Sequence, residues 1–359
     1  MPDNTNRLLA SDKLRCPDCT GSFHLDDQLV CDSCGNTFPL VGDIPLLMPK
    51  PEEMVGIWQN RFANFVNGQQ RNIQSNTQLI ESSTLYPPLR ERLKTITRAR
   101  AVNLKTIIEL MAPLQELGPG VPPTTNTDAL GSFMLLVYLL RDWGWNTDEV
   151  DILCSTVISS LPSDLELDSL LVLGSGACRD SFNLHNHFQC KFTVSVDIAP
   201  LMLMGAQRAV SGGPLSLYQI QPNNVRNAQD NVTHWELKAP RKPEHDFLYM
   251  FADATRMPFT DESFQAVLTP FIIDAVGEDL RSFAPRVHRL LEPGGYWANY
   301  GAMTFMPGFS YTAEEVLSIV SESGFRILEH GFSTKPHLAP RESCQQQVFD
   351  CLYFSAVKE

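Results

Sequence analysis

The stretch Leu170-Leu-Val-Leu-Gly-Ser-Gly-Ala-Cys-Arg-Asp180 decides the fold that the sequence predicts. Four apolar residues run directly into Gly174-Ser-Gly176, a pattern typical of a strand that is buried on both faces and ends in a tight turn. Glycines at that turn let the backbone bend sharply, and they let a ligand approach the main chain at the start of the next helix. The stretch therefore predicts the first strand, the glycine loop and the first helix of a β-α-β unit.

A second short strand, Ser195-Val-Asp197, ends in an acid 23 residues after Gly174 (174 to 197). An acid at the tip of the second strand of a β-α-β unit is placed to hold the two hydroxyls of a ribose. A glycine pair alone is common in turns, so by itself it says little about a ligand. The glycines and the acid together favour a cofactor that contains a nucleoside.

Length and charge limit the classes of protein that fit. The chain has 359 residues, a formal net charge of −13 at pH 7 and a pI near 5.1. This length allows two domains and a small third one. The acidity suits a protein that acts on small molecules or on proteins, and it argues against a large phosphate-binding surface. The longest apolar run, 133–140, has eight residues and the N-terminus is polar. We therefore expect no membrane span, no signal peptide and a cytoplasmic location.

Four cysteines near the N-terminus form two C-x-x-C pairs, Cys16-Pro-Asp-Cys19 and Cys31-Asp-Ser-Cys34, with eleven residues (20–30) between them. Thiolates at this spacing can converge on one tetrahedral Zn²⁺, and four protein ligands make a closed, structural site. The metal would replace the core that so short a segment cannot build. A chance cluster or a redox C-x-x-C is the alternative. The sequence thus predicts a structural zinc site formed by Cys16, Cys19, Cys31 and Cys34.

The residues around the second cysteine pair carry a resemblance. Phe38-Pro39 and Gly42-Asp-Ile-Pro45 follow the cysteines closely. This segment resembles the zinc ribbon of Trm112-like proteins, which combines the cysteine knuckles with such a hairpin. The resemblance implies a module of a kind that occurs beside methyltransferases or fused to them.

Alternating strands and helices are predicted after the glycine loop. Strands are expected at about 247–253, 264–271, 296–300, 325–330 and 347–357, with helices at about 200–209, 281–291 and 314–323 and a turn at 292–295. Residues 211–245 are polar and rich in Asn, Gln, Gly and Pro, which predicts a long insertion of the kind used as a lid or substrate loop. Alternation that ends in two late strands predicts a doubly wound, Rossmann-like α/β fold.

Four motifs in this order resemble class I methyltransferases that use S-adenosylmethionine. They are Gly174-x-Gly176, Asp197, Ala252-Asp-Ala254 with Met257-Pro-Phe259, and Leu291-Glu-Pro-Gly-Gly295. The resemblance implies that the glycines approach the amino-acid end of the cofactor, that Arg179 pairs with its carboxylate, and that the two acids hold the ribose and the adenine amino group. The cofactor-binding residues implied are Gly174, Gly176, Arg179, Asp197, Asp253, Ala254 and Pro270. The chain then divides into a zinc ribbon (1–50), a helical linker or cap (51–165), with a loop at 118–126 and helical spacing over 129–161, and a methyltransferase domain (166–359).

Further segments resemble the carnosine N-methyltransferase family, which includes the methyltransferase portion of ovothiol-synthesis enzymes. They are Arg141-Asp-Trp143, Thr269-Pro-Phe-Ile-Ile-Asp-Ala275, Tyr296-Trp-Ala-Asn-Tyr-Gly301 and Phe349-Asp-Cys-Leu-Tyr-Phe354, and the resemblance runs over about 133–359. In that family an Asp after the fourth strand hydrogen-bonds one imidazole nitrogen and leaves the other free to attack the methyl group. Asp274 occupies that position. The resemblance implies a helix at 138–149 that closes over the active site.

The chain also departs from the family pattern. It has Phe305-Met306 where the family usually has Tyr-His, and Phe349 where the family has Tyr. A pocket with fewer polar groups suits a softer acceptor, such as a histidine with sulfur or selenium on its ring. We therefore predict that Asp274 is the catalytic residue and that the substrate-binding residues are Trp143, Phe271, Asp274, Asn299, Phe305 and Phe349.

Two other functions fit parts of the pattern. An N-terminal zinc ribbon fused to this fold also occurs in a methyltransferase of rRNA bases, but the acidic chain has no basic stripe, and Thr269-Pro-Phe-Ile replaces the Asn-Pro-Pro-Tyr of amino-group methylases. An adaptor of a partner methyltransferase would not need the glycines and both acids intact. We expect a small-molecule imidazole substrate, no nucleic acid and no membrane, and the oligomeric state stays open.

Overall fold

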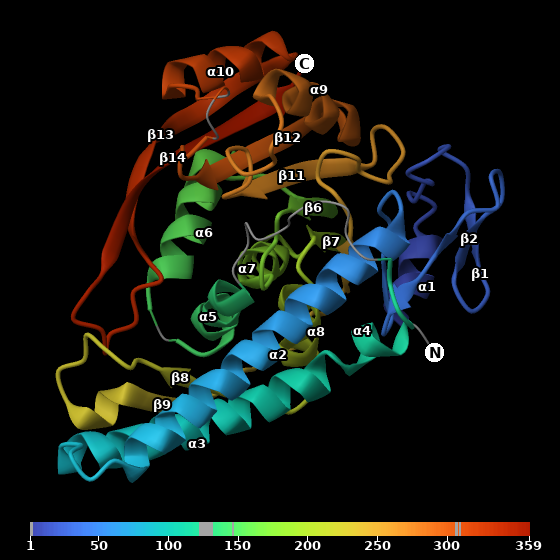
Figure 1. Cartoon of the computed structure of the whole chain (residues 1–359). Helices are drawn as coiled ribbons and strands as arrows, with labels where there is room; N and C mark the ends of the chain where they lie inside the picture. Colours follow the sequence, from blue (N-terminus) through green and yellow to red (C-terminus); the bar gives the residue numbers. More distant parts are fainter. Residues whose placement is uncertain (1–2, 122–131, 146, 306–307, 309) are drawn as a thin grey trace.

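A seven-stranded sheet forms the centre of the molecule (Figure 1). The computed structural model describes residues 3–121, 132–145, 147–305, 308 and 310–359. The strand order is β10-β7-β6-β11-β12-β14-β13, and β14 runs antiparallel to both of its neighbours. The strands are β6 (Ser169–Leu173), β7 (Phe192–Asp197), β10 (Asp246–Phe251), β11 (Phe264–Pro270), β12 (Leu291–Gly301), β13 (Phe325–His337) and β14 (Gln347–Lys358).

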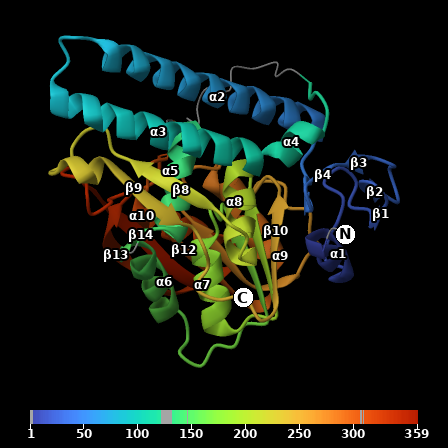
Figure 2. The same ribbon diagram turned by 90° about the horizontal axis from the view of Figure 1, so that it is seen from below.

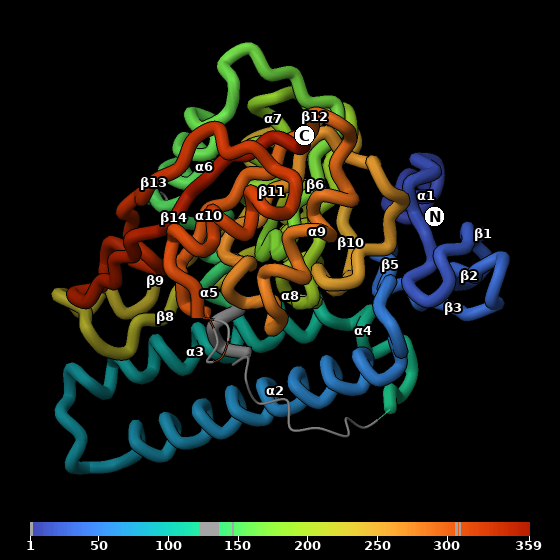
Figure 3. Tube along the Cα trace, turned by 90° about the horizontal axis from the view of Figure 1, so that it is seen from above, coloured from blue at the N-terminus to red at the C-terminus, as the bar shows by residue number. Residues whose placement is uncertain are grey.

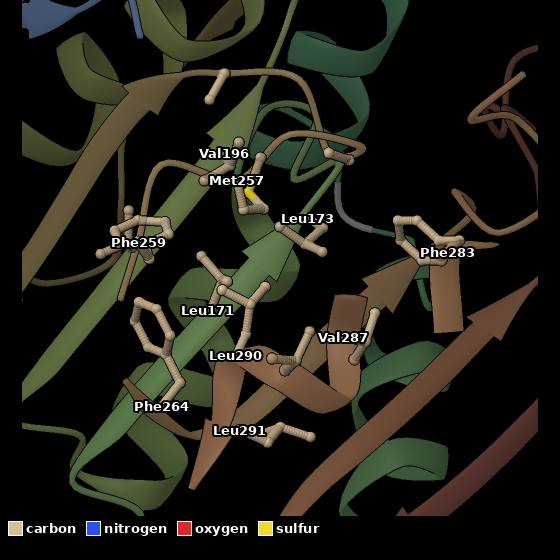
Figure 4. Close-up of a cluster of buried hydrophobic side chains, with 14 of the residues drawn as sticks. Leu171, Leu173, Val196, Met257, Phe259, Phe264, Phe283, Val287, Leu290 and Leu291 are labelled. Atoms are coloured by element: carbon tan, nitrogen blue, oxygen red, sulfur yellow. The ribbon is translucent and has the colours of Figure 1, made fainter. Parts of the chain in front are cut away.

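Helices cover both faces of this sheet. On one face lie α6 (Glu149–Ser160), α7 (Arg179–Phe188) and α8 (Pro200–Ser211), and on the other α9 (Leu280–Leu290) and α10 (Ala313–Glu322). Side chains alternate along a strand, so β6 supplies both layers: Leu170 and Val172 pack with α6, whereas Leu171 and Leu173 pack with α9 and α10. Figure 4 shows Leu171 and Leu173 beside Val287 and Leu290 of α9. The predicted doubly wound α/β fold is confirmed.

The strands and helices predicted after the glycine loop are present, with some changed limits. The predicted strand at 325–330 is longer, because β13 continues to His337 and pairs with β14 along its whole length. Residues 292–295, predicted as a turn, form the irregular start of β12, where the register against β11 shifts. The extension of β13 brings Lys335 and His337 to Glu149, the first residue of α6.

The insertion between β7 and β10 is more regular than predicted. Residues 216–236 contain an antiparallel hairpin of β8 (Ser216–Ile220) and β9 (Val232–Glu236), linked by the short helix η1 (Ala228–Asn231). The polar composition hid the alternating burial of β8, whose Leu217 and Gln219 face inward. The hairpin lies beside the far end of β13 and β14 (Figure 3), where Val225 and Ser343 form a β-bridge.

The segment predicted as a helical linker or cap contains long helices. Helices α2 (Pro51–Glu81) and α3 (Pro87–Leu110) run side by side, and α4 (Ala112–Glu116), α5 (Ser132–Trp143) and α6 follow (Figure 2). Trp58 of α2 and Ile107 of α3 share one apolar cluster with Leu201 and Met202 of α8. The part of the predicted loop and helix at 122–131 lies outside the described residues. The boundaries 1–50, 51–165 and 166–359 stay predictions. Among the described helices, none is long and apolar enough to span a membrane.

The N-terminal module, residues 3–50, packs on the edge strand β10. It contains α1 (Asp3–Ala10) and the short strands β1 (Phe23–Leu25), β2 (Leu29–Cys31), β3 (Thr37–Phe38), β4 (Leu40–Val41) and β5 (Ile44–Pro45). The Leu47 amide donates to the Phe251 carbonyl at 2.8 Å, and the Asn4 side chain exchanges two hydrogen bonds with the Tyr249 backbone, at 2.8 and 2.9 Å. A bare edge strand invites unwanted pairing, so the module shields this edge of the sheet.

Replacement of Asn4 by Ala should lower the free energy of unfolding by about 1–3 kcal/mol, because it leaves a buried amide and a buried carbonyl of β10 without their partner. Urea denaturation would measure the change. Arg7→Ala is the matched control on the same helix, since the ion pairs of Arg7 are solvent-exposed and should matter little. Equal stability losses in the two variants would contradict this role of Asn4.

Candidate functional site

A cavity of about 430 Å³ opens at the carboxyl ends of β6, β7 and β11. Strand β6 lies between the other two. From β6 the chain runs through β7 to β10 on one side of β6 and then crosses to β11 on the other side, and ligands bind at such a switch point in open α/β sheets. The wall combines the glycine loop, the loops after β7, β10 and β11, helix α5 and the end of β13. It consists of residues 174–176, 196–199, 252–254 and 270–272 with Tyr138, Arg141, Asp180, Met202, Ala275, Val276 and His337.

The glycine loop has little conformational choice. Gly174 has φ +66°, and a Cβ there would lie 2.6 Å from the Ile272 side chain. Asp197 fixes the loop from the other side: one carboxylate oxygen accepts from the Gly176 amide and the other from the Ala199 amide, each at 2.8 Å. Burial raises the pKa of Asp197 to about 6. The predicted residues Gly174, Gly176 and Asp197 thus meet at the cavity.

Three more of the predicted cofactor residues also lie on the wall. Asp253, Ala254 and Pro270 border the cavity. One Asp253 oxygen accepts from the backbone and hydroxyl of Thr255, at 2.8 Å each, as an acid in a turn does. These bonds fix the carboxylate at the end of β10 while it still borders the cavity.

Arg179 lies elsewhere. Its guanidinium stacks over the Trp143 ring at 5.2 Å and donates to the Asp142 carbonyl at 3.3 Å, and it is not part of the cavity wall. Trp143 is buried as well, and its Nε1 donates to the Ala177 carbonyl at 2.7 Å, which braces the glycine loop from behind. The guanidinium on the wall belongs to Arg141. The sequence contained this signal, because Arg141 begins the Arg-Asp-Trp tripeptide.

Of the predicted substrate residues, Phe271 lies on the wall. It has φ +50°, and its amide donates to the Tyr300 carbonyl at 2.8 Å. Gly301 makes room for this arrangement, because a Cβ there would meet the Phe271 Cα at 2.9 Å. Phe349 lies behind the wall and stacks on His337, with ring centroids 4.3 Å apart and an interplanar angle of 17°.

The structure places three other predicted residues outside the wall. Asp274 is buried, and one of its carboxylate oxygens accepts from the Thr304 amide at 2.8 Å and from the Thr304 hydroxyl at 2.6 Å. The Asn299 side-chain amide lies inside the sheet, 2.9 Å from the Thr269 hydroxyl oxygen. Phe305 packs edge-on against Tyr311. For Asn299 and Phe305 the structure gives packing partners, whereas Asp274 lies in the chain between the wall residues Ile272 and Ala275.

A buried cluster of charges beside the cavity was not predicted. Arg141 pairs with Asp142 at 2.6 Å and lies 3.8 Å from Glu149, and Lys335 and His337 each lie 3.9 Å from the same Glu149 oxygen. All five are at least nine-tenths buried by side chain. Nearby, burial raises the pKa of the wall residue Asp180 to about 6. The five members come from α5, α6 and β13, so no local motif in the sequence indicates the cluster.

The four predicted metal ligands also meet in space. The sulfurs of Cys16, Cys19, Cys31 and Cys34 all lie within 4.8 Å of one another. Four thiols at such distances fit a tetrahedral Zn²⁺ with Zn–S bonds of about 2.3 Å. The site joins the two knuckles of the N-terminal module, whose strands β1 and β2 lie at the periphery of the molecule (Figure 1).

Comparison with known protein families shows the family of this chain. The strand order and the glycine loop with its acid define a class I methyltransferase. A family model described as carnosine N-methyltransferase matches residues 124–359, more than half of the chain. The chain therefore belongs to the carnosine N-methyltransferase family, and it is an S-adenosylmethionine-dependent methyltransferase. No curated protein sequence matches the chain.

Solved structures resemble the chain only distantly. A SAM-dependent methyltransferase from Methanosarcina mazei is 14% identical, with 56% of this chain and 96% of that one covered and a TM-score of 0.38. A complex between the Haloferax volcanii Trm112 methyltransferase activator and a methyltransferase is 14% identical, with 62% of this chain and 95% of that one covered and a TM-score of 0.42. A SAM-dependent methyltransferase from Thermotoga maritima is 15% identical, with 63% of this chain and 93% of that one covered and a TM-score of 0.37. At these values the similarities carry no argument about function.

Cys19→Ser should abolish stoichiometric metal binding, because a tetrahedral site that loses one of four ligands holds Zn²⁺ far more weakly. Elemental analysis of the purified protein should fall from about one zinc per chain to well below half of that, and the melting temperature should fall with it. Cys344→Ser, at an exposed cysteine outside the cluster, is the control. Unchanged zinc content in Cys19→Ser would contradict the assignment.

Cofactor affinity should depend on pH through Asp197. Its raised pKa, about 6, means that the carboxylate is ionised above pH 6 and protonated below it. The ionised form is the better acceptor for ribose hydroxyls, so affinity should be full above pH 6 and fall about tenfold per unit below it. Calorimetric titration of S-adenosylhomocysteine between pH 5 and 8 would measure this. Asp197→Asn should bind weakly at every pH, and a variant profile that copies the wild-type slope would refute the role of Asp197.

Proposed function

We propose that the protein transfers the methyl group of S-adenosylmethionine to a ring nitrogen of a small histidine derivative, such as 5-thiohistidine, 5-selenohistidine or a carnosine-like peptide. The family to which the chain belongs supports the reaction type. The observation that carries the proposal is that a single cavity is lined both by Asp197 and by Phe271, Tyr138 and His337. Aromatic side chains beside a cofactor site suit a flat ring as the acceptor.

The cofactor supplies an electrophilic methyl group on a sulfonium. On this chain, Gly174 and Gly176 leave the backbone open toward its amino-acid end, and Asp197 would hold the ribose hydroxyls and Asp253 the adenine amino group. We assign the carboxylate partner to Arg141 in place of Arg179, because Arg141 borders the cavity and Arg179 stacks behind it. A guanidinium binds a carboxylate through paired N–H groups, which fixes orientation as well as charge.

Asp274 is the proposed partner of the acceptor ring. A carboxylate can accept about four hydrogen bonds. Asp274 accepts two from Thr304, both on one oxygen. The Thr304 bonds would orient the carboxylate and leave its other oxygen for the N–H of a neutral imidazole. Holding that N–H fixes the tautomer, so the bare ring nitrogen faces the methyl group.

Methyl transfer then depends on alignment and on charge. Nucleophile, methyl carbon and sulfur must lie in line, which a rigid pocket achieves at little entropic cost. As the ring nitrogen bonds to carbon, positive charge develops on the ring, and a buried carboxylate at the opposite N–H stabilises it. Phe349, which stands where the family has Tyr, suits a ring that carries sulfur or selenium.

The proposal is tested by incubation with S-adenosylmethionine and a panel of histidine, carnosine, 5-thiohistidine, 5-selenohistidine and total rRNA. Mass spectrometry should find one added methyl group on an imidazole compound. Methylation of rRNA alone would contradict the proposal and identify the zinc ribbon as the guide to substrate.

Asp274→Asn should lower kcat/KM for the imidazole acceptor by about 100-fold, because the amide cannot balance the charge that develops on the ring. The Kd of S-adenosylhomocysteine should stay unchanged, since Asp274 is not among the residues that line the cavity. Asp261→Asn, at an exposed surface pair with Arg289, is the matched control. Intact turnover in Asp274→Asn would show that this carboxylate does not hold the ring.

A further inference from the structure

His337, the last residue of β13, is held on the cavity wall by aromatic rings from three other elements. It stacks on Phe349 of β14 and lies 6.0 Å from the Phe271 ring and 6.3 Å from the Tyr138 ring. Its side chain is 10% exposed, and it borders the cavity. These contacts fix the plane of the imidazole, so the ring can turn little without losing its stack on Phe349.

A buried carboxylate lies behind this imidazole. His337 Nδ1 lies 3.9 Å from Glu149 Oε1. This nitrogen is buried, and among the described residues it has no hydrogen-bond partner. The same Glu149 oxygen accepts from the Leu338 amide, next to His337, at 3.2 Å. A carboxylate that faces one imidazole nitrogen favours the tautomer with the proton there, which leaves the other nitrogen bare. The bare Nε2 is then the ring nitrogen available to a ligand.

The other charges around His337 keep it neutral. Burial and the positive charges of Arg141 and Lys335 lower the pKa of His337 to about 4. Asp142 and Glu149 balance these two cations, and Tyr138 is uncharged at neutral pH. A neutral imidazole with its proton on Nδ1 can only accept a hydrogen bond at Nε2. The ligand group that meets it must therefore carry an N–H or O–H.

We infer that His337, oriented by Glu149, accepts a hydrogen bond from the α-nitrogen of the methyl acceptor and so selects acceptors with an amino group at that position. The inference rests on the proposed function. A neutral imidazole ring has a single N–H, and the proposed function gives that one to Asp274. The donor that remains in a histidine derivative is its α-nitrogen, which is an ammonium in the free amino acid. The α-ammonium of the cofactor is the other source of the same chemistry.

The test compares 5-thiohistidine with its des-amino analogue, which has the same ring and carboxylate. His337→Phe keeps the stack on Phe349 and removes both nitrogens. It should lower kcat/KM for 5-thiohistidine by about 10- to 100-fold, mainly through KM, as expected for one hydrogen bond to a charged group. The analogue should react equally with variant and wild type. His337→Gln, which keeps an acceptor oxygen, should restore part of the loss, and Glu149→Gln should show a smaller loss of the same kind.

The controls separate the possible failures. His330→Phe, at an exposed position on the same strand, should change neither acceptor. Equal losses for the two acceptors in His337→Phe and His337→Gln would overturn the inference while the proposed function stands. In the same variants, a raised Kd of S-adenosylhomocysteine without a change in acceptor preference would assign His337 to the cofactor. This result would also overturn the inference. If wild type binds S-adenosylhomocysteine but methylates no imidazole compound, the proposed function itself fails, and this inference with it.

Discussion

The hydrogen bonds of the Asp197 carboxylate are the interaction on which the cofactor end of the cavity depends. Its two oxygens join the glycine loop after β6 to the start of α8, and they do so in a half-buried place where desolvation raises the pKa of the carboxyl. Ile272, from the loop after β11, closes on Gly174 from the other side. Three loops thus converge where β6 separates β7 from β11, and each limits the conformation of the next.

Segments outside the sheet act on the site through the strands and helices that they brace. The N-terminal module binds the edge strand β10, and Asp253 stands just after the end of that strand. Helices α2 and α3 pack on α8 and α5, and α5 carries Arg141 to the wall. The N-terminal module, α2 and α3 contribute no residue to the cavity wall, but through these contacts they help to position the residues that do.

The sequence predicted those features whose signal is local. A buried apolar run, a glycine pair, an acid at a strand tip and two cysteine pairs each occupy a few neighbouring residues, and the structure brings them together as expected. The sequence could not indicate the charge cluster, because Glu149 and His337 are 188 residues apart (149 to 337). They meet only through the extension of β13 along β14. Asn299 is a different case: a family motif pointed to the substrate, and the structure shows a buried side chain bonded to the Thr269 hydroxyl.

The buried charges beside the cavity are hard to explain by stability. Removing Arg141, Lys335 and Glu149 from water costs free energy that ion pairs rarely recover, and apolar side chains of the same size often stabilise a fold as well or better. Oxygens of Asp142 and Glu149 are buried without a hydrogen-bond partner among the described residues, which adds to that cost. Groups so arranged, next to the wall of a methyltransferase cavity whose cofactor has a charged amino-acid end, are better explained by ligand binding than by folding.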